Sequence, residues 1–129
     1  MNKNYVMNDD GEKMMCPIRF ALDIVGSKWK QPIICMLSEG KPLRNGAIKR
    51  RLTGVTNIML SQSLRELESC GIVHRKQYNE VPPKVEYTLT EKGHKLIPAL
   101  LELCAWSEEL MKEEKACISY CNFCKKIAG

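Results

Sequence analysis

The sequence predicts a mainly α-helical domain with one small β-hairpin, and two observations indicate it. Apolar residues recur at the spacing of amphipathic helices over residues 16–70 and again beyond residue 91. Between these segments, over residues 72–89, the apolar period changes to two, which is the spacing of a strand. The chain has 129 residues, of which 44% are hydrophobic and 27% charged, so we expect one domain with a core of its own.

Two helices are expected on either side of Gly26 and Ser27, which interrupt the helical pattern. The first follows Cys16-Pro17, and its apolar residues at i, i+3, i+4 and i+7 are Ile18, Ala21, Leu22 and Val25. The second begins at about Lys28, with Pro32 in its first turn, where a missing N–H is tolerated. Its apolar face comprises Trp29, Ile33, Met36 and Leu37.

A helix-turn-helix pair is expected after the break at residues 40–42. A short basic helix over about residues 45–52 leads through a turn at residues 53–54 into a longer helix over about 57–70. Thr56 is the predicted N-cap of the longer helix, and Gly71 is its predicted C-terminal cap. Leu64 and Leu67 should face the core, together with either Met59 or Leu60.

A hairpin and a long helix complete the predicted order. Residues 72–78 and 84–89 have the pattern of strands, and the connection between them contains two prolines that keep its tip stiff. Thr90 should cap a helix that runs from about Glu91 to beyond Met111, with a kink or one disturbed turn at Pro98. That helix carries more apolar surface than a small domain covers alone, at Leu96, Leu100, Leu103, Trp106 and Leu110.

Three parts of the chain are expected: a flexible arm over residues 1–15, a folded domain over 16–114, and a cysteine-rich tail over 115–129. No apolar run approaches the roughly 20 residues that a membrane span needs. The polar N-terminus lacks the apolar segment of a secretory signal. We therefore expect a cytoplasmic protein with no membrane partner.

The net charge of +5 is unevenly distributed along the chain. Residues 26–90 hold 11 basic and 5 acidic residues, a net of +6, whereas the segments before and after carry −1 and 0. An excess of this kind indicates a polyanion partner such as DNA, although a solvated basic face without a partner gives the same pattern.

Two helices joined by a short turn and followed by a basic hairpin form the layout of a winged helix-turn-helix. One helix of such a pair fits the major groove of B-DNA, and the hairpin beside it reaches the phosphates. The candidate DNA-binding residues are Arg44, Thr56, Asn57, Ser61, Gln62, Arg65, Arg75, Lys76 and Lys84.

Five ordered blocks, over roughly residues 16–107, resemble the HxlR-type family of MarR-like bacterial winged-helix transcriptional regulators. The blocks include CP and ALDIVGSKW near the start, KPLR and KRRL, MLSQSLRELE, GIV, and the most specific one, VPPKVEYTLT at residues 81–90. The resemblance implies a sequence-specific regulator that binds an inverted repeat in double-stranded DNA as a homodimer. It also implies that the first and last helices form the dimer interface.

Two positions depart from the family pattern. Asn45 stands where members usually have an aromatic residue, and Ile58 stands where they usually have a basic one. Ile58 could pack inward or contact a thymine methyl group. No nucleophile–base pair, phosphate loop or paired carboxylates stand out, so no enzyme activity is expected.

Seven cysteines without a secretory signal should be reduced thiols. Cys16 matches the family's cysteine before the first helix, which in some members senses oxidants or electrophiles. The thiolate that such chemistry needs is favoured by a helix N-terminus and by a cation such as Arg19. A small apolar residue at the dimer interface is the alternative interpretation, and both stay open. Cys35 and Cys70 are expected in the core.

Cys117, Cys121 and Cys124 form a C-x3-C-x2-C pattern, which places three thiols on one face of a helix. With a fourth ligand they could hold zinc or an iron–sulfur cluster. A reduced, partly buried face is the favoured interpretation, so no cofactor is expected. The alternative functions are a thiol- or metal-binding protein that uses the winged helix as a scaffold, and a winged helix that binds only proteins.

Overall fold

The computed structural model describes residues 5–113 of the chain. In chain order its elements are β1 (Tyr5–Met7), β2 (Lys13–Met15), α1 (Pro17–Val25), α2 (Lys30–Leu37), α3 (Asn45–Arg51), α4 (Asn57–Ser69), β3 (Val73–Tyr78), β4 (Lys84–Leu89) and α5 (Glu91–Glu113). From α1 onward this is the predicted order of helix, helix, helix-turn-helix, hairpin and helix. The fold is the mainly helical winged helix-turn-helix that the sequence predicts.

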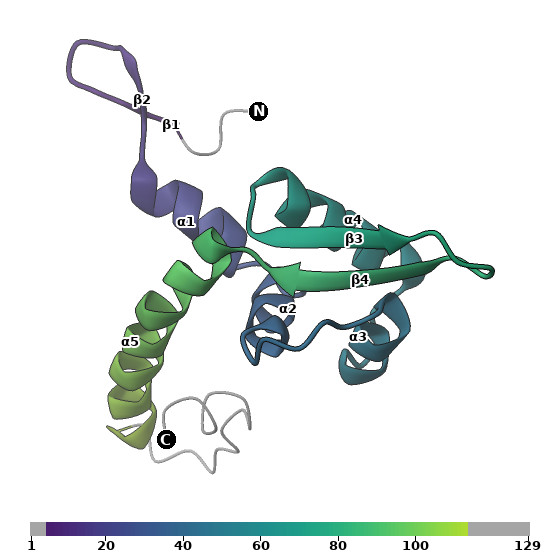
Figure 1. Cartoon of the computed structure of the whole chain (residues 1–129). Helices are drawn as coiled ribbons and strands as arrows, with labels where there is room; N and C mark the ends of the chain where they lie inside the picture. The colour runs from purple at the N-terminus through teal and green to yellow at the C-terminus, as the bar shows by residue number, and fades with distance from the viewer. Residues whose placement is uncertain (1–4, 114–129) are drawn as a thin grey trace.

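Figure 1 shows how these elements are arranged in space. The β3–β4 hairpin lies across α2, α3 and α4, and its tip projects beyond them. The helices α1 and α5 lie at the opposite end of the molecule, and the short β1–β2 hairpin extends from the start of α1. None of the helices in the described part of the chain is long and apolar enough to cross a membrane.

The core lies between the helix-turn-helix pair, α2 and the hairpin. All five residues from Ile33 to Leu37 in α2 are buried in this core, which explains why the sequence of α2 is strongly apolar. Pro32 is the third residue of α2 and so lies in the first turn, as predicted. In α4 it is Leu60, not Met59, that faces the core. The fully buried side chains are Ile33, Ile34, Leu37, Ile48, Leu60, Leu64, Leu67 and Val73.

Both ends of α4 are capped as the sequence predicts. Thr56 Oγ1 accepts a hydrogen bond from the Met59 backbone N–H at 3.1 Å. At the other end, Gly71 has φ +76°, and its N–H donates to the Glu68 carbonyl at 3.0 Å. The Ile72 N–H donates to the Leu67 carbonyl at 3.0 Å, which completes a Schellman motif. Because the two caps fix where α4 begins and ends, they also fix the direction of its exposed face relative to the hairpin that follows.

Thr90 joins the start of α5 to the end of α4. Its Oγ1 accepts from the Gly93 N–H at 3.1 Å, which is the predicted N-cap. The same hydroxyl donates toward the carbonyls of Gly71 and Ile72, at 2.5 and 3.1 Å. The helix α5 then continues through Pro98, which has no N–H to donate, so one bond of that turn is missing.

Residues 5–15, within the predicted N-terminal arm, form a short hairpin that the sequence pattern did not indicate. Tyr5–Met7 pairs with Lys13–Met15 in an antiparallel hairpin, with Val6 opposite Met14. Its turn is held by Asn8, whose Oδ1 accepts from the backbone N–H groups of Asp10 and Glu12 at 3.0 and 2.7 Å. Strands of three residues are too short to show a clear period, and this explains why the sequence pattern missed them.

The prediction that Cys70 lies in the core is wrong, whereas Cys35 is buried as expected. Cys70 is exposed because it caps α4 beyond the last buried position, Leu67. The chain turns at Gly71, and Ile72 closes the core at this end instead of Cys70.

Candidate functional site

The outer face of α4 carries the polar residues that the sequence singled out. Since Leu60, Leu64 and Leu67 face the core, the residues between them face outward. A shallow hollow runs along this face, and its lining residues are Asn57, Ile58, Ser61, Gln62, Arg65 and Glu66. The candidates on α4 are therefore brought together on one exposed surface, which we call the α4 face.

Ile58 belongs to the α4 face and does not pack inward, since 79% of its surface is exposed. Of the two places that the sequence left open for it, only the outer one agrees with the structure. An apolar side chain between hydrogen-bonding residues suits a surface that meets thymine methyl groups.

Lys49 connects α3 to the first residue of α4. Its Nζ donates to Asn57 Oδ1 at 2.7 Å. The amide of Asn57 therefore turns its oxygen toward α3 and leaves its Nδ2 group as a donor. Lys49, Arg50 and Arg51 are all exposed in the last turn of α3, next to the α4 face.

Arg44 is the N-cap residue of α3 and is exposed. The residue before it, Leu43, links the helix-turn-helix to the hairpin. Leu43 and Tyr87 exchange two backbone hydrogen bonds, of 3.0 and 2.8 Å. The sequence pattern did not predict this link, since a single bridged residue has no period. The bridge fixes where Arg44 lies relative to the wing.

The outer face of the wing, which is the β3–β4 hairpin, holds a compact charged cluster. The ring of Tyr78 lies beneath two ammonium groups, with Lys76 Nζ 4.9 Å and Lys84 Nζ 4.7 Å from its centroid. The Tyr78 hydroxyl donates to Glu86 at 3.0 Å, and Lys84 Nζ lies 3.6 Å from the other Glu86 oxygen. Lys84 is thus half-buried and paired, whereas Lys76 is exposed.

Arg75 lies on the other face of the wing. The register pairs Arg75 with Tyr87 and places both on the side of buried Val73, while Lys76 pairs with Glu86 on the outer side. Arg75 is exposed, and its guanidinium donates to Gln77 at 3.4 Å. The three basic wing candidates therefore do not form one group.

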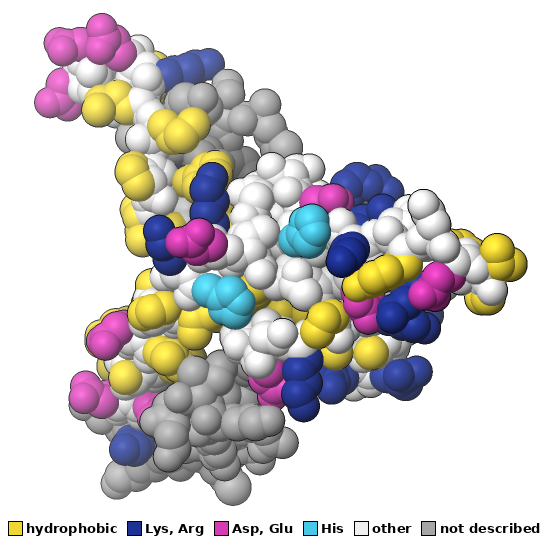
Figure 2. Space-filling view, in the orientation of Figure 1, with side chains coloured by type: hydrophobic (Ala, Val, Ile, Leu, Met, Phe, Trp, Pro, Cys, Tyr) yellow, Lys and Arg dark blue, Asp and Glu magenta, His cyan; other side chains and the backbone are white. Residues whose placement is uncertain are grey.

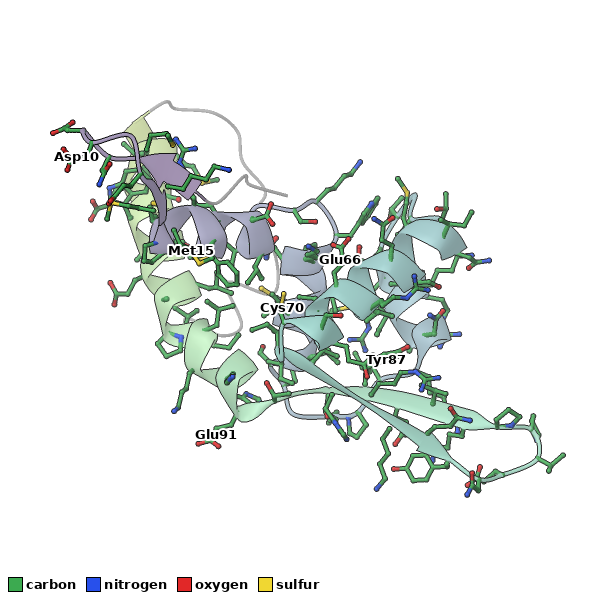
Figure 3. All side chains as sticks on the ribbon, turned by 90° about the horizontal axis from the view of Figure 1, so that it is seen from above. Asp10, Met15, Glu66, Cys70, Tyr87 and Glu91 are labelled. Carbon is green, nitrogen blue, oxygen red and sulfur yellow. The ribbon has the colours of Figure 1, made fainter. Side chains whose placement is uncertain are left out.

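A further contact joins the α4 face to α2. Lys30 Nζ pairs with Glu66 Oε2 at 2.6 Å, and Gln62 Nε2 donates to Glu66 Oε1 at 3.2 Å. Figure 3 labels Glu66 on α4, on the side that meets α2. Gln62 was predicted from its position on the helix, but Lys30 and Glu66 were not, because nothing in the spacing of residues 30 and 66 brings them together.

Basic and apolar side chains are concentrated at different ends of the surface. Figure 2 shows Lys and Arg side chains gathered over the wing and the helices beside it, while apolar side chains follow α1 and α5 on the other side. On α5, Leu96 and Leu100 pack against the core, whereas Trp106 is 61% exposed. The exposed large apolar side chains at this end are Ile18, Phe20, Leu22, Leu103, Trp106 and Leu110.

Cys16 is half-buried and directly precedes Pro17, the first residue of α1. Its carbonyl accepts the Phe20 N–H at 3.0 Å, so the thiol is carried at the N-terminus of the helix as predicted. Within residues 5–113, no three His, Cys, Asp or Glu side chains come together as metal ligands. The predicted tail ligands Cys117, Cys121 and Cys124 lie outside the described residues.

Known proteins that are similar to this chain match it over most of its length. The family model described as HxlR-like helix-turn-helix matches residues 24–115. An HTH-type transcriptional regulator from Methanothermobacter thermautotrophicus is 47% identical over 102 residues, which cover 79% of this chain and 76% of the relative.

Two solved structures extend the comparison. A transcriptional regulator of the MarR family from Enterococcus faecalis V583 has a TM-score of 0.69 at 42% identity, over 76% of this chain and 88% of its own. The redox regulator HypR in its oxidized form has a TM-score of 0.63 at 45% identity, over 73% of this chain and 96% of its own.

Proposed function

The chain belongs to the HxlR-like helix-turn-helix family of transcriptional regulators, and on that premise we propose that it binds an inverted-repeat operator as a homodimer. The observation that carries the proposal is the α4 face, where Asn57, Ser61, Gln62 and Arg65 are exposed together beside a basic wing. Such side chains bond base edges in the major groove, while Arg44, Arg75, Lys76 and Lys84 neutralise phosphates. A protein that binds chromosomal DNA in this way acts in the cytoplasm.

The homodimer is supported by the apolar end of the molecule. Six large apolar side chains on α1 and α5 are exposed in the single chain, as a dimer interface requires. A second copy that covers these helices through a two-fold axis would place two α4 faces against two half-sites.

We further propose that thiol oxidation controls DNA binding through Cys16. Two observations support this: Cys16 lies at the N-terminus of α1, within the proposed dimer interface, and the similar protein HypR is a redox regulator. An intersubunit disulfide, formed between the Cys16 thiols of the two copies, would shift the two α4 faces relative to each other.

The test is a selection of bound sequences from a random duplex library, with reduced and with diamide-treated protein. Diamide takes up two electrons and two protons as two thiols become one disulfide. We expect the reduced protein to enrich an inverted repeat, and the oxidised protein to lose it. A Cys16→Ser variant should keep the enrichment under both conditions.

Failure at each stage has its own meaning. If the reduced protein enriches no sequence, the proposed operator binding is wrong. If oxidation leaves the enrichment of the wild-type protein unchanged, the thiol response is wrong while operator binding stands. If Cys16→Ser loses binding on oxidation like the wild type, another thiol is responsible.

A further inference from the structure

The carboxylate of Glu66 connects the α4 face to the interior of the fold. One of its oxygens pairs with Lys30 Nζ at 2.6 Å, and the other accepts from Gln62 Nε2 at 3.2 Å. Glu66 and Gln62 lie one turn apart on α4, whereas Lys30 is the first residue of α2. A candidate base-reading residue is thus held by a contact that crosses between two helices.

Lys30 is itself fixed in place. Only 13% of its side-chain surface is exposed, compared with 44% for Glu66. Its backbone N–H donates to Ser27 Oγ at 3.4 Å, at the turn where α1 gives way to α2. Because the ammonium group is carried on a largely buried stem, it holds the Glu66 carboxylate in one position before any ligand arrives. The entropy cost of ordering the Gln62 side chain is then part of folding, so it does not reduce the affinity for DNA.

The contact also decides which way the amide of Gln62 points. An ionised carboxylate can only accept hydrogen bonds, so the amide nitrogen must face Glu66 and the amide oxygen must face away. One N–H of Gln62 is used in this contact, which leaves Oε1 and the second N–H. An acceptor next to a donor is the pair that matches N6 and N7 of adenine. Guanine presents two acceptors at this edge and does not match.

We propose that Glu66 is a specificity-determining positioning residue, which together with Lys30 orients the amide of Gln62 to read adenine in the major groove. Glu66 itself acts through Gln62 and need not contact the base. The inference rests on the proposed function of α4 as the DNA-reading helix.

The experiment starts from the sequence that the wild-type protein enriches. Comparison with the Gln62→Ala variant identifies the base pair whose preference depends on Gln62. Affinities are then measured by fluorescence anisotropy for that duplex and for the duplex with G·C at this one position. The proposal expects the wild-type protein to prefer adenine there by about tenfold or more.

Two variants interrupt the contact from opposite sides. Glu66→Ala removes the carboxylate, and Lys30→Met keeps the buried stem but removes the charge that fixes Glu66. Both should lower the preference for adenine at this position to the level of Gln62→Ala and leave other positions unchanged. The double variant of Gln62→Ala and Glu66→Ala should lose no more than Gln62→Ala alone.

Glu68→Ala is the matched control, because it removes the same charge from an exposed position of the same helix. It should raise overall affinity slightly and keep the preference for adenine. Thermal melts establish that each variant is folded, and Lys30→Met provides the test if Glu66→Ala does not fold.

The outcomes separate the proposal from its premise. If Glu66→Ala and Lys30→Met keep the full preference that Gln62→Ala loses, the positioning role is wrong although the protein still reads DNA. A Gln62-dependent base other than adenine overturns the orientation argument. If the wild-type protein enriches no sequence at all, the proposed function itself fails.

Discussion

Lys49 in the last turn of α3 donates to Asn57, the first residue of α4, across 2.7 Å. The contact joins the two helices of the helix-turn-helix at the end of α4 where the α4 face begins. It also turns the donor end of the Asn57 amide outward. The pair therefore contributes both to the packing of the two helices and to the surface that α4 offers to DNA.

Replacement of Asn57 by Asp should change stability and DNA binding in opposite directions. A carboxylate at the N-terminus of α4 and beside Lys49 should stabilise the fold by about 0.3–1 kcal/mol. The same negative charge on the α4 face should weaken binding to every DNA sequence. Urea unfolding and fluorescence anisotropy measure the two effects. Asn57→Ala, as the control, should lose affinity without the gain in stability, and a joint rise of both quantities for Asn57→Asp would contradict the prediction.

Loss of Arg65 should reduce specificity at one base position. Arg65 is exposed on the α4 face, so Arg65→Ala should cost about 1–3 kcal/mol at the base that the guanidinium contacts. Arg19→Ala removes the same charge from α1, outside the basic end of the surface, and should leave base preference unchanged. Competition between operators with single base changes measures the difference. Equal losses for all sequences would instead make Arg65 a phosphate contact.

The wing should contribute affinity without sequence preference. Lys84→Gln should weaken binding to all sequences and flatten the dependence of log K on log salt by about 0.9. Glu86→Gln should instead strengthen binding to all sequences, because the Glu86 carboxylate pairs with Lys84 at 3.6 Å and repels phosphate. Anisotropy titrations at several salt concentrations test both variants. A weaker Glu86→Gln complex would show that Glu86 is needed to hold the lysines in position.

Gly93 should not tolerate a side chain, although it lies in the first turn of a helix. A Cβ at this position would stand 2.5 Å from the Ile72 carbonyl oxygen and 2.8 Å from a Leu89 methyl carbon. Gly93→Ala should therefore destabilise the fold by about 1–3 kcal/mol, the usual cost of overpacking. Gly46→Ala is the control, because a Cβ there meets nothing within 4 Å and adds helix propensity. Urea unfolding that gave both variants the same sign would contradict the prediction.

A charge at Trp106 should separate the subunits without unfolding them. Trp106 is 61% exposed in the single chain, so Trp106→Glu has little of the monomer core to disturb. We expect a monomer with lower operator affinity in sedimentation experiments. Val81→Glu is the matched control for sedimentation only, since Val81 is an exposed apolar residue at the tip of the wing, and that variant should remain a dimer. A Trp106→Glu protein that still sediments as a dimer would place the interface elsewhere.

The elements of the fold could largely be predicted from the sequence. The caps at Thr56, Gly71 and Thr90 were predicted correctly, because capping depends on residues within one turn of each other. The family resemblance is confirmed as well. The errors lie where local signals are weak, in three-residue strands at residues 5–15 and in the position of Cys70 at a helix end.

The candidate site could be predicted only in part. A helical period of 3.6 predicts which residues of α4 are exposed on one face, and Asn57, Ser61, Gln62 and Arg65 do lie there together. The positions of Ile58 and Glu66 on the same face were not predicted. The contacts of Lys84 with Glu86 and with the ring of Tyr78 were not predicted, although a strand period of two places Lys84 and Glu86 on one face and the register pairs Tyr78 with Lys84.

The sequence by itself determined the order of the elements from α1 onward, the caps at the two ends of α4 and the basic character of the middle segment. These properties depend on residues a few positions apart, so periodicity and caps report them. The tertiary structure decided the contacts between Leu43 and Tyr87, Lys49 and Asn57, and Lys30 and Glu66. Such pairs come from different elements, and only the packing of those elements around a shared core brings their polar groups within hydrogen-bond distance.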